Sequence, residues 1–304
     1  MQISVNIVTR NDLRYLPDLF RSLAAQTYPE LTIRVLDNGS TDGTLEYLQA
    51  QHPQFLVARN VRNLGAAAGY NQLIRFTLER VGEADLAERG VLILHADVIL
   101  HERCIEELVA VLKQSPTLGA VQPKLLRAYA ADGQSDEVNQ GVQSDVLDST
   151  GLFLAKTWRI TERGAGELDH GQFDAQVDIF GVSLACALWR ATALKASSCQ
   201  GEAYDVEFMS ALIDGDLALR ATRRGVKSAF APLAKAYHYL DVNPTLAARN
   251  HIFLLLKNLT WGDWFRSGWR VLPNAGLRFI QVLGQHPRLV MKMLGKRSVV
   301  HFTE

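Results

Sequence analysis

Short apolar runs alternate with helically spaced apolar residues over the first 125 residues of the chain. The apolar runs predict strands at residues 3–8, 32–36, 55–59, 91–94 and 118–121. Between them, the periodicity predicts helices at about 16–23, from the end of segment 63–69 to about 78, and at about 102–113. This alternation predicts an α/β fold with a Rossmann-like, mostly parallel sheet and helices on both of its faces.

A polar corner follows each of the first four predicted strands. These corners are residues 9–12, 37–42, 63–69 and 95–97. In open parallel sheets, ligands bind beyond the carboxyl ends of the strands. We therefore expect a ligand site where the corners meet.

Residues 128–178 lack regular periodicity and are rich in Gly, Asp, Gln and Ser. They predict an irregular or hairpin-like insertion. Beyond it, the pattern predicts a strand at 180–188, a helix at 216–224, a short strand at 228–231 and helices at 246–261 and 275–294. From Pro244 onward the apolar pattern is helical only. We therefore expect a main domain over 1–243 and a helical extension over 244–304.

Composition and charge argue against several classes of protein. Apolar residues make up 48% of the chain and charged residues 21%, the balance of a globular protein rather than a disordered one. Basic and acidic residues both number 32, and this zero net charge weighs against a nucleic-acid-binding protein. The three cysteines lie far apart without metal-ligand spacing, which argues against a disulfide framework or structural zinc and suits a reducing cytoplasm.

The ends of the chain predict no secretory or membrane-spanning segment. The N-terminus lacks a basic region and a long apolar stretch, and the apolar run 252–256 is far shorter than the roughly 20 residues of a spanning helix. The extension interleaves aromatic and basic residues, namely Lys257, Trp261, Trp264, Phe265, Arg266, Trp269 and Arg270. This composition suits peripheral contact with a membrane and equally suits helices that cover the main domain.

Several acidic residues have both a structural and a chemical interpretation. Asp37 either caps a turn or accepts the N3–H of a uracil or thymine base. Asp97 either caps a strand end or binds a divalent ion on a diphosphate, because Mg²⁺ and Mn²⁺ prefer carboxylate oxygens. Of Asp214 and Asp216, one caps the following helix while the other points into a cleft.

His238 and the segment 65–69 are open to two interpretations as well. A lone histidine after an apolar segment is either a structural residue or a ligand. Residues 65–69 lack the middle glycine of a dinucleotide-binding motif. Their small side chains either let the backbone approach a nucleotide sugar or pack a helix against the sheet.

The order of these segments resembles family 2 glycosyltransferases with the GT-A fold. The matching runs are Ile-Val-Thr-Arg-Asn (7–11), Gln-Thr-Tyr-Pro (26–29), Val-Leu-Asp-Asn-Gly-Ser-Thr-Asp (35–42), Asn-Leu-Gly-Ala-Ala-Ala-Gly-Tyr-Asn (63–71), Leu-His-Ala-Asp-Val (94–98), Leu-Gly-Ala-Val-Gln-Pro-Lys-Leu (118–125), Tyr-Asp-Val-Glu-Phe (204–208), Asp-Gly-Asp-Leu-Ala-Leu-Arg (214–220), and then Pro232 and His238. The resemblance covers about residues 2–260. It implies a nucleotide-sugar-binding half over 1–125 and an acceptor-binding and catalytic half over 126–243.

The resemblance also implies roles for individual residues. The nucleotide-sugar donor would be bound by Thr9, Asn11, Asp37, Asn38, Asn63, Gly65, Asn71, His95 and Asp97. Asp97 and His238 would ligate a divalent metal, Mn²⁺ or Mg²⁺, on the donor diphosphate, and Asp214 would be the catalytic base. Two positions depart from the family pattern, because His95 stands where Asn or Asp is usual and Ile213 where a Glu usually precedes the base.

Within the family, residues 148–152, 163–167 and 171–174 resemble the bacterial rhamnosyltransferases. This resemblance implies an inverting transferase with a dTDP- or UDP-sugar donor, dTDP-rhamnose first among them, and a saccharide or polyprenyl-linked acceptor. The implied role is the synthesis of surface polysaccharide of the cell envelope, in the cytoplasm or at the inner face of the cell membrane.

Two other functions stay open. One is a catalytically weakened carbohydrate- or partner-binding protein of the same fold, which His95 and Ile213 favour. The other is a nucleotidyltransferase, which usually needs a Gly/Arg/Lys-rich phosphate loop near the N-terminus, whereas residues 9–14 contain no glycine.

Overall fold

The computed structural model describes residues 1–79, 82–129, 142–208, 211–239, 244–260, 262–263 and 270–271. The chain forms two compact units, the first of residues 1–153 and 162–240 and the second of residues 154–161 and 241–304. Within the described residues, no helix is long and apolar enough to cross a membrane. The helix expected at 275–294 lies outside them.

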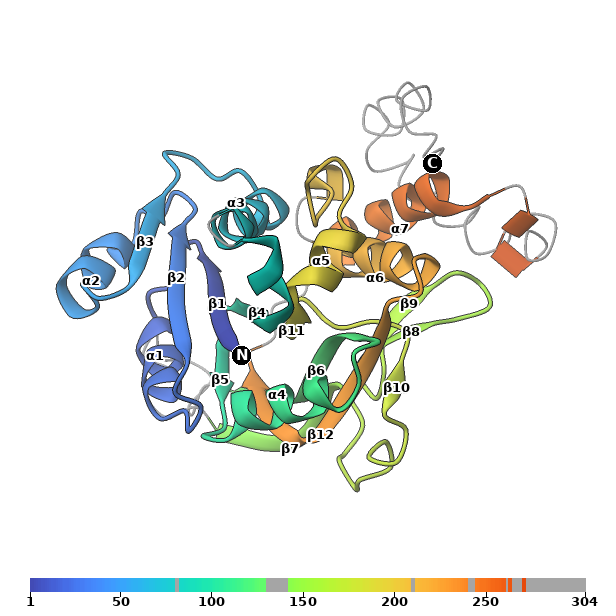
Figure 1. Ribbon diagram of the computed structural model, residues 1–304, viewed down its shortest axis with the longest axis horizontal. Helices are drawn as coiled ribbons and strands as arrows, with labels where there is room; N and C mark the ends of the chain where they lie inside the picture. Colours follow the sequence, from blue (N-terminus) through green and yellow to red (C-terminus); the bar gives the residue numbers. More distant parts are fainter. Residues whose placement is uncertain are drawn as a thin grey trace. The chain divides into compact units, whose positions relative to one another are not determined.

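A mixed sheet lies at the centre of the first unit (Figure 1). Its described strands are β1 (Gln2–Thr9), β2 (Leu31–Asp37), β3 (Leu56–Arg59), β4 (Arg89–His95), β5 (Val98–Leu100), β6 (Leu118–Tyr129), β7 (Val142–Ser149), β10 (Asp178–Ile179), β11 (Cys186–Arg190) and β12 (Lys227–His238). Eight of them follow the order β10-β12-β6-β11-β4-β1-β2-β3, while β5 pairs with β12 and β7 pairs with β6. β8 (Leu152–Leu154) and β9 (Ile160–Glu162) pair separately.

The N-terminal half of the sheet is parallel. β1 lies between β2 and β4 and is parallel to both, and β3 is parallel to β2. β11 then runs antiparallel between β4 and β6, and β12 is parallel to β6. Because both faces of the parallel strands are covered, Ile7 on one face of β1 and Asn6 on the other are both fully buried.

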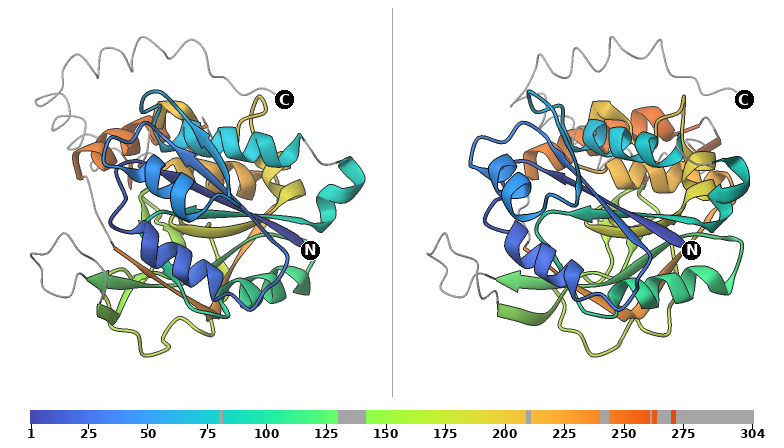
Figure 2. Two further views of the ribbon diagram at one scale, coloured as in Figure 1. Left: turned by 90° about the vertical axis from the view of Figure 1, so that its left-hand side faces the viewer. Right: turned by 60° about the vertical axis from the view of Figure 1, so that its left-hand side comes forward.

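Helices cover both faces of this sheet. In the first unit they are α1 (Leu16–Ala24), α2 (Thr44–Gln51), α3 (Ala66–Leu78), α4 (Cys104–Gln114), α5 (Ala191–Ser197) and α6 (Ile213–Arg223), with the short 3-10 helices η1 (Glu83–Glu88) and η2 (Val206–Phe208). α1 and α4 lie on one face and α3 and α6 on the other (Figure 2). The second unit contains α7 (Pro244–Asn258). The predicted sheet with helices on both faces is therefore confirmed.

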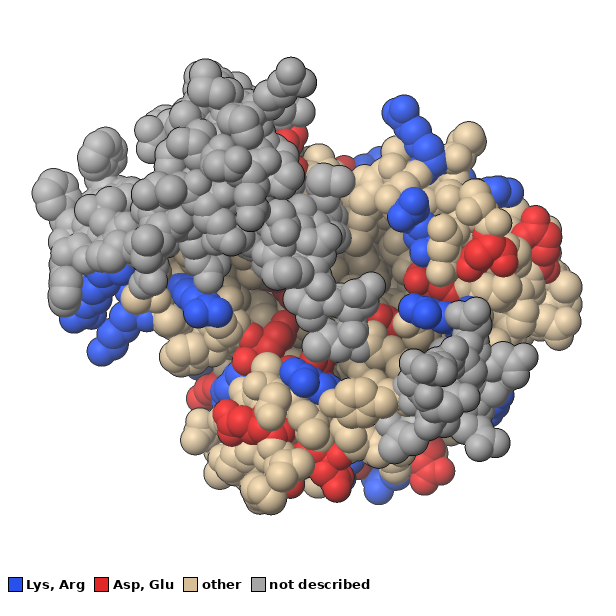
Figure 3. Space-filling model, turned by 180° about the vertical axis from the view of Figure 1, so that it is seen from behind, with Lys and Arg blue, Asp and Glu red and all other residues tan. Residues whose placement is uncertain are grey.

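Charged side chains of both signs are interspersed over the described part of the face shown in Figure 3. This agrees with the zero net charge of the chain.

The strand expected at 228–231 is wrong in its extent, because β12 continues to His238. Pro232 interrupts the apolar pattern and cannot donate a ladder hydrogen bond. The register of β12 against β6 shifts between Ala231 and Lys235, so a bulge accommodates the proline. The second part of the strand then places His238 opposite Val98 of β5.

The strand expected at 180–188 is also wrong in its extent, because β11 begins at Cys186. The backbone N–H groups of Ser183 and Leu184 are bound by side chains, Gln122 Oε1 and Asp214 Oδ2 respectively. N–H groups that bind side chains cannot also form the inter-strand hydrogen bonds of a sheet. The insertion after residue 128 is hairpin-like, since β7 pairs antiparallel with β6, and residues 130–141 within it lie outside the described part of the chain.

Candidate active site

A pocket of about 280 Å³ lies at the carboxyl ends of β1, β2 and β4, where the polar corners meet. Six of the nine residues expected to bind a donor line it, namely Thr9, Asn38, Asn63, Gly65, His95 and Asp97. Arg10, Asp12 and Tyr70 also line the pocket. The sequence had not singled out these three, although Arg10 and Asp12 belong to the first polar corner.

Asn38 holds the loop that forms one wall of this pocket. Its Nδ2 donates to Asn63 Oδ1 (3.1 Å) and to the Gly65 carbonyl (3.2 Å). Its Oδ1 accepts from Asn60 Nδ2 (3.0 Å) and from the backbone N–H of Leu64 (3.2 Å). The asparagines thus bind one another and fix the loop before α3 in place.

The two glycines of segment 65–69 have different surroundings. The helix-packing interpretation is confirmed, and the approach of a nucleotide sugar stays a prediction. Gly65 lines the pocket and has a φ of 86°, a left-handed conformation that favours glycine. Gly69 lies where α3 packs on the sheet, because a Cβ there would come within 2.9 Å of Val8 Cγ1. The segment therefore brings backbone to the pocket and also seats the helix.

Asn11, Asp37 and Asn71 do not line the pocket. Asn11 Oδ1 accepts from the Thr41 N–H (2.8 Å), and Asn71 binds the backbone N–H and carbonyl of Tyr204 (2.8 and 2.7 Å). Asp37 is fully buried, with Oδ1 bound to the Ser40 N–H (2.9 Å) and Oδ2 at 3.4 Å from Arg59 Nε. Direct contact with a donor stays a prediction for these three residues.

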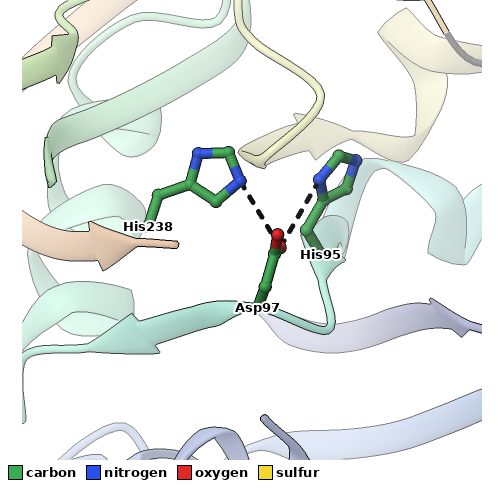
Figure 4. Close-up of side chains that lie close together, drawn as sticks. All are labelled: His95, Asp97 and His238. Atoms are coloured by element: carbon green, nitrogen blue, oxygen red, sulfur yellow. Dashed lines mark ion pairs between the residues drawn. The ribbon is translucent and has the colours of Figure 1, made fainter. Parts of the chain in front are cut away.

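His95, Asp97 and His238 come together beside this pocket (Figure 4). Asp97 Oδ1 lies 3.4 Å from His238 Nε2 and 3.8 Å from His95 Nδ1. One ligand atom from each residue falls within 4.8 Å of the others. The pairing of β12 with β5 brings His238 to Asp97, and the Tyr239 N–H donates to the Asp97 carbonyl (3.0 Å).

Asp148 orients the ring of His238. Its Oδ2 lies 2.8 Å from His238 Nδ1, and both side chains are almost completely buried. A histidine that ligates a metal usually binds a carboxylate or carbonyl through its other ring nitrogen. This arrangement directs Nε2 toward Asp97 and fits a divalent cation.

Asp214 lies in the first turn of α6 and does not line the pocket. Its Oδ2 accepts from the Leu184 N–H (3.0 Å) and its Oδ1 from the Gly215 N–H (2.8 Å). Burial raises the pKa of Asp214, and these backbone hydrogen bonds oppose the rise. Asp216, two residues on, is buried and pairs with Arg220, whose Nε lies 3.0 Å from Oδ2. This ion pair within α6 is not a helix cap, and a capping role for Asp216 stays a prediction.

Residues 4–135 match the model of the glycosyl transferase family 2. An N-acetylglucosaminyl-diphospho-decaprenol L-rhamnosyltransferase of Mycobacterium tuberculosis is 25% identical over 275 residues, which are 85% of this chain and 86% of that protein. The chain is a glycosyltransferase, and its residues 4–135 match family 2. The resemblance seen in the sequence is thereby confirmed.

Solved structures show that the glycosyltransferase has the GT-A fold. GalNAc-T7 in complex with UDP, GalNAc and Mn²⁺ has a TM-score of 0.61 at 13% identity, over 84% of this chain. The chain spans 48% of the length of GalNAc-T7. S. aureus TarS 1–349 in complex with UDP-GlcNAc has a TM-score of 0.54 at 15% identity, over 98% of this chain and 80% of TarS 1–349.

The charge states of His95 and Asp97 suit a cation site in this glycosyltransferase, whereas His238 would have to give up a proton. Burial lowers the pKa of His95 to about 4, so its imidazole is neutral at pH 7 and has a free lone pair. Burial would raise the pKa of Asp97, but the hydrogen bond and charge of His238 hold it below its usual value. Burial would likewise lower the pKa of His238, but the hydrogen bonds to Asp148 and Asp97 raise it to about 10. A cation on Nε2 would take the place of that proton.

The sequence analysis did not single out Asp148, which contacts His238, or Glu162, whose pKa the charge of Asp214 raises. Asp148 belongs to the run that resembles rhamnosyltransferases, which is the one signal that pointed to it. Glu162 precedes another such run and gave no signal of its own. Both lie in the weakly periodic insertion, so their positions depend on strand pairing rather than on a local pattern.

Proposed function

We propose that this glycosyltransferase moves L-rhamnose from dTDP-rhamnose to a polyprenyl-linked saccharide, with inversion at the anomeric carbon. The observation that carries the proposal is the 25% identity, over 85% of the chain, to an L-rhamnosyltransferase named for its lipid-linked N-acetylglucosaminyl acceptor. We further propose that residues 1–243 form the catalytic domain and that the reaction serves surface polysaccharide synthesis at the inner face of the cell membrane.

The pocket suits the donor end of the reaction. Thr9, Asn38 and the loop at Asn63 and Gly65 surround a space beyond the strand ends, the usual place for a nucleotide in a sheet of this kind. Arg10 also lines the pocket and brings a positive charge toward an anionic donor. These residues bind and orient the nucleoside diphosphate in the proposal.

Asp97 and His238 would hold the divalent metal, with His95 beside them. Such an ion supplies Lewis-acid stabilisation of the negative charge that develops on the departing diphosphate. Asp148 keeps the His238 ring directed at Asp97, and His95 contributes a neutral nitrogen. An imidazole and carboxylate donor set favours Mn²⁺ over Mg²⁺.

Asp214 accepts the proton of the acceptor hydroxyl in this mechanism. The acceptor oxygen forms its bond to the anomeric carbon as the bond from that carbon to the nucleoside diphosphate breaks, and the proton passes to the carboxylate. One base and one displacement invert the anomeric configuration. The Leu184 and Gly215 N–H groups keep the carboxylate in place before the acceptor arrives.

Thermal unfolding of the full-length protein in the presence of nucleotide sugars tests the donor. The samples contain dTDP-rhamnose, UDP-GlcNAc, GDP-mannose or a CMP-sugar, each with and without Mn²⁺. We expect dTDP-rhamnose to raise Tm most and Mn²⁺ to enlarge the shift, because a ligand of the folded state stabilises it. A larger shift with GDP-mannose or the CMP-sugar than with dTDP-rhamnose contradicts the proposed donor.

A further inference from the structure

Glu162, the last residue of β9, receives a hydroxyl on each carboxylate oxygen. Ser149 Oγ donates to Oε2, and Ser183 Oγ donates to Oε1 at 3.0 Å. Ser149 Oγ also accepts from Gln122 Nε2 (2.8 Å) and from the Gly151 N–H (3.1 Å). Because both lone pairs of the Ser149 oxygen are occupied, its proton is directed at Glu162.

Gln122 closes these contacts into a ring. Its Nε2 binds Ser149 and its Oε1 accepts the N–H of Ser183, so Gln122, Ser149, Glu162 and Ser183 form one continuous hydrogen-bonded circuit. Gln122 and Ser149 are fully buried and Ser183 is 6% exposed. A buried polar network whose members are all satisfied has a rigid geometry.

The hydrogen-bonded ring is connected to Asp214 through the Ser183–Leu184 backbone. Ser183, which the ring holds by its hydroxyl and its N–H, precedes Leu184 in the chain. The Leu184 N–H donates to Asp214 Oδ2 at 3.0 Å. A shift of Ser183 would therefore move the hydrogen bond that fixes one oxygen of the proposed base.

Arg163, the next residue after Glu162, is fixed by hydrogen bonds to Thr150. Its Nε donates to Thr150 Oγ1 (2.9 Å) and its Nη2 to the Thr150 carbonyl (2.8 Å). The Thr150 N–H in turn donates to the Arg163 carbonyl (3.0 Å). These bonds join the end of β9 to the end of β7, so Glu162 is placed before any substrate binds.

We infer that Glu162 is a positioning residue for Asp214, holding the Ser183–Leu184 backbone that orients the base carboxylate. This inference rests on the proposed function, since it takes Asp214 as the base. Glu162 itself need not touch the acceptor or the donor.

The electrostatic interaction between Glu162 and Asp214 supports the same arrangement. Burial first, and then the negative charges of Asp214 on α6 and Asp148 on β7, raise the pKa of Glu162 to about 8. Two carboxyl groups that interact in this way lose their protons in two separate steps. Burial raises the pKa of Asp214 as well, and its two backbone N–H donors oppose that rise.

Two substitutions test the inference. Glu162→Gln keeps a side chain that can bind both serines, whereas Glu162→Ala opens the ring. Glu167→Gln is the matched control, because Glu167 is an exposed acidic residue of the same insertion. For each variant we measure kcat, KM and donor dissociation constant with the transferred nucleotide sugar, and hydrogen exchange of peptides that contain Leu184.

We expect Glu162→Ala to lower kcat about tenfold or more, less than the roughly 10²–10⁴-fold of losing a base outright. Donor affinity should stay within twofold, since Glu162 does not line the pocket. Glu162→Gln should restore kcat at pH 7 to within threefold of wild type. Exchange at Leu184 should accelerate in Glu162→Ala only.

The pH profile separates this role from a merely structural one. In the wild type, ionisation of Glu162 near pH 8 adds a negative charge beside Asp214 and strengthens it as a base, so kcat rises through this range. In Glu162→Gln that rise should be absent. The inference is overturned if Glu162→Ala keeps its kcat and its Leu184 protection, or if the Gln variant keeps the rise.

The exchange measurement distinguishes a wrong inference from a wrong function. If no sugar is transferred by the wild type but Leu184 loses protection in Glu162→Ala and not in Glu162→Gln, the proposed function is wrong and the positioning of the Asp214 segment stands. If sugar is transferred and Leu184 exchange is the same in all variants, the positioning role is wrong and the function stands.

Discussion

At the scale of single residues, the proposed function assigns the central chemical step to Asp214. Asp214→Asn keeps the size of the side chain and can still accept a backbone N–H, but it cannot take up the acceptor proton. We expect kcat to fall by about 10²–10⁴-fold while the donor dissociation constant stays near that of the wild type. Steady-state kinetics together with donor titration measures both. If the variant keeps most of its activity, the base lies elsewhere, and Glu207 and Asp205 are the next candidates.

The cation site gives a second prediction at this scale. Asp97→Ala removes the carboxylate between the two histidines and should abolish the Mn²⁺-dependent part of donor binding. Asp148→Asn leaves the ligands in place but weakens the orientation of His238, which typically costs about 10–100-fold in metal affinity. Calorimetric titration of Mn²⁺ in the presence of dTDP measures these affinities.

Asp145→Asn is the control for the metal titration. Asp145 is exposed and lies on the same strand as Asp148. Its substitution should leave the Mn²⁺ affinity unchanged. Activity that persists at the wild-type rate in the presence of a chelator would count against the assignment of Asp97 and His238.

Residues at strand ends could be predicted from the sequence, and residues in the insertion could not. Thr9, Asn38, His95 and Asp97 follow apolar runs, and parallel strands place such residues at one edge of a sheet. Asp148 and Glu162 lie where the pattern is weak. Their contacts with His238 and Ser183 arise from pairing between distant segments, which no local period reveals.

At the scale of elements, one ion-pair cluster ties the insertion to the sheet. Lys124 on β6 is only 4% exposed, and its Nζ lies 2.9 Å from Asp169 Oδ2 and 2.8 Å from Asp174 Oδ1. Burial would raise the pKa of Asp169, but the hydrogen bonds from Lys124 and from the Gly171 N–H hold it below 3.8. A carboxyl group with a lowered pKa stabilises the fold above its usual pKa and loses that contribution as the pH falls.

Asp169→Asn should therefore lower the free energy of unfolding by about 1–3 kcal/mol at pH 7. Lys124 keeps Asp174 as a partner, so the loss should not exceed that range. The difference from the wild type should shrink as the pH falls below about 3.8, the pKa in the unfolded chain, toward the lower pKa of folded Asp169. Urea unfolding at pH 7, 5 and 3.5 measures it, with the exposed Asp178→Asn as control. A difference that does not vary with pH would contradict the assigned charge state.

Periodicity located the elements better than it located their ends. The core of α1, with Leu16, Leu19 and Leu23 buried, follows the predicted helical spacing. The errors occur at Pro232 and at Ser183–Leu184, where a bulge and side-chain hydrogen bonds replace the regular ladder. Both irregular segments contact residues of the proposed active site, since one extends β12 to His238 and the other binds Asp214.

At the scale of the whole molecule, the C-terminal extension gives a membrane prediction. Trp261, Trp264 and Trp269 lie outside the described residues, so this prediction rests on sequence. Replacing Trp264 and Trp269 by Ala in the full chain should reduce cosedimentation with anionic vesicles severalfold, because interfacial tryptophans anchor a peripheral segment. Exposed Phe153→Ala, in the first unit, is the control. Unchanged sedimentation of the double variant would favour the alternative in which the extension covers the catalytic domain.

Transfer itself is the most direct test of the central claim. The full-length protein is incubated with Mn²⁺, dTDP-rhamnose and a polyprenyl diphosphate-linked N-acetylglucosamine, and the product is analysed by mass spectrometry and NMR. We predict the addition of one rhamnose with an anomeric configuration opposite to that of the donor, and loss of that product in Asp214→Asn. Transfer of a different sugar in place of rhamnose, or a product that retains the configuration of the donor, would contradict the account.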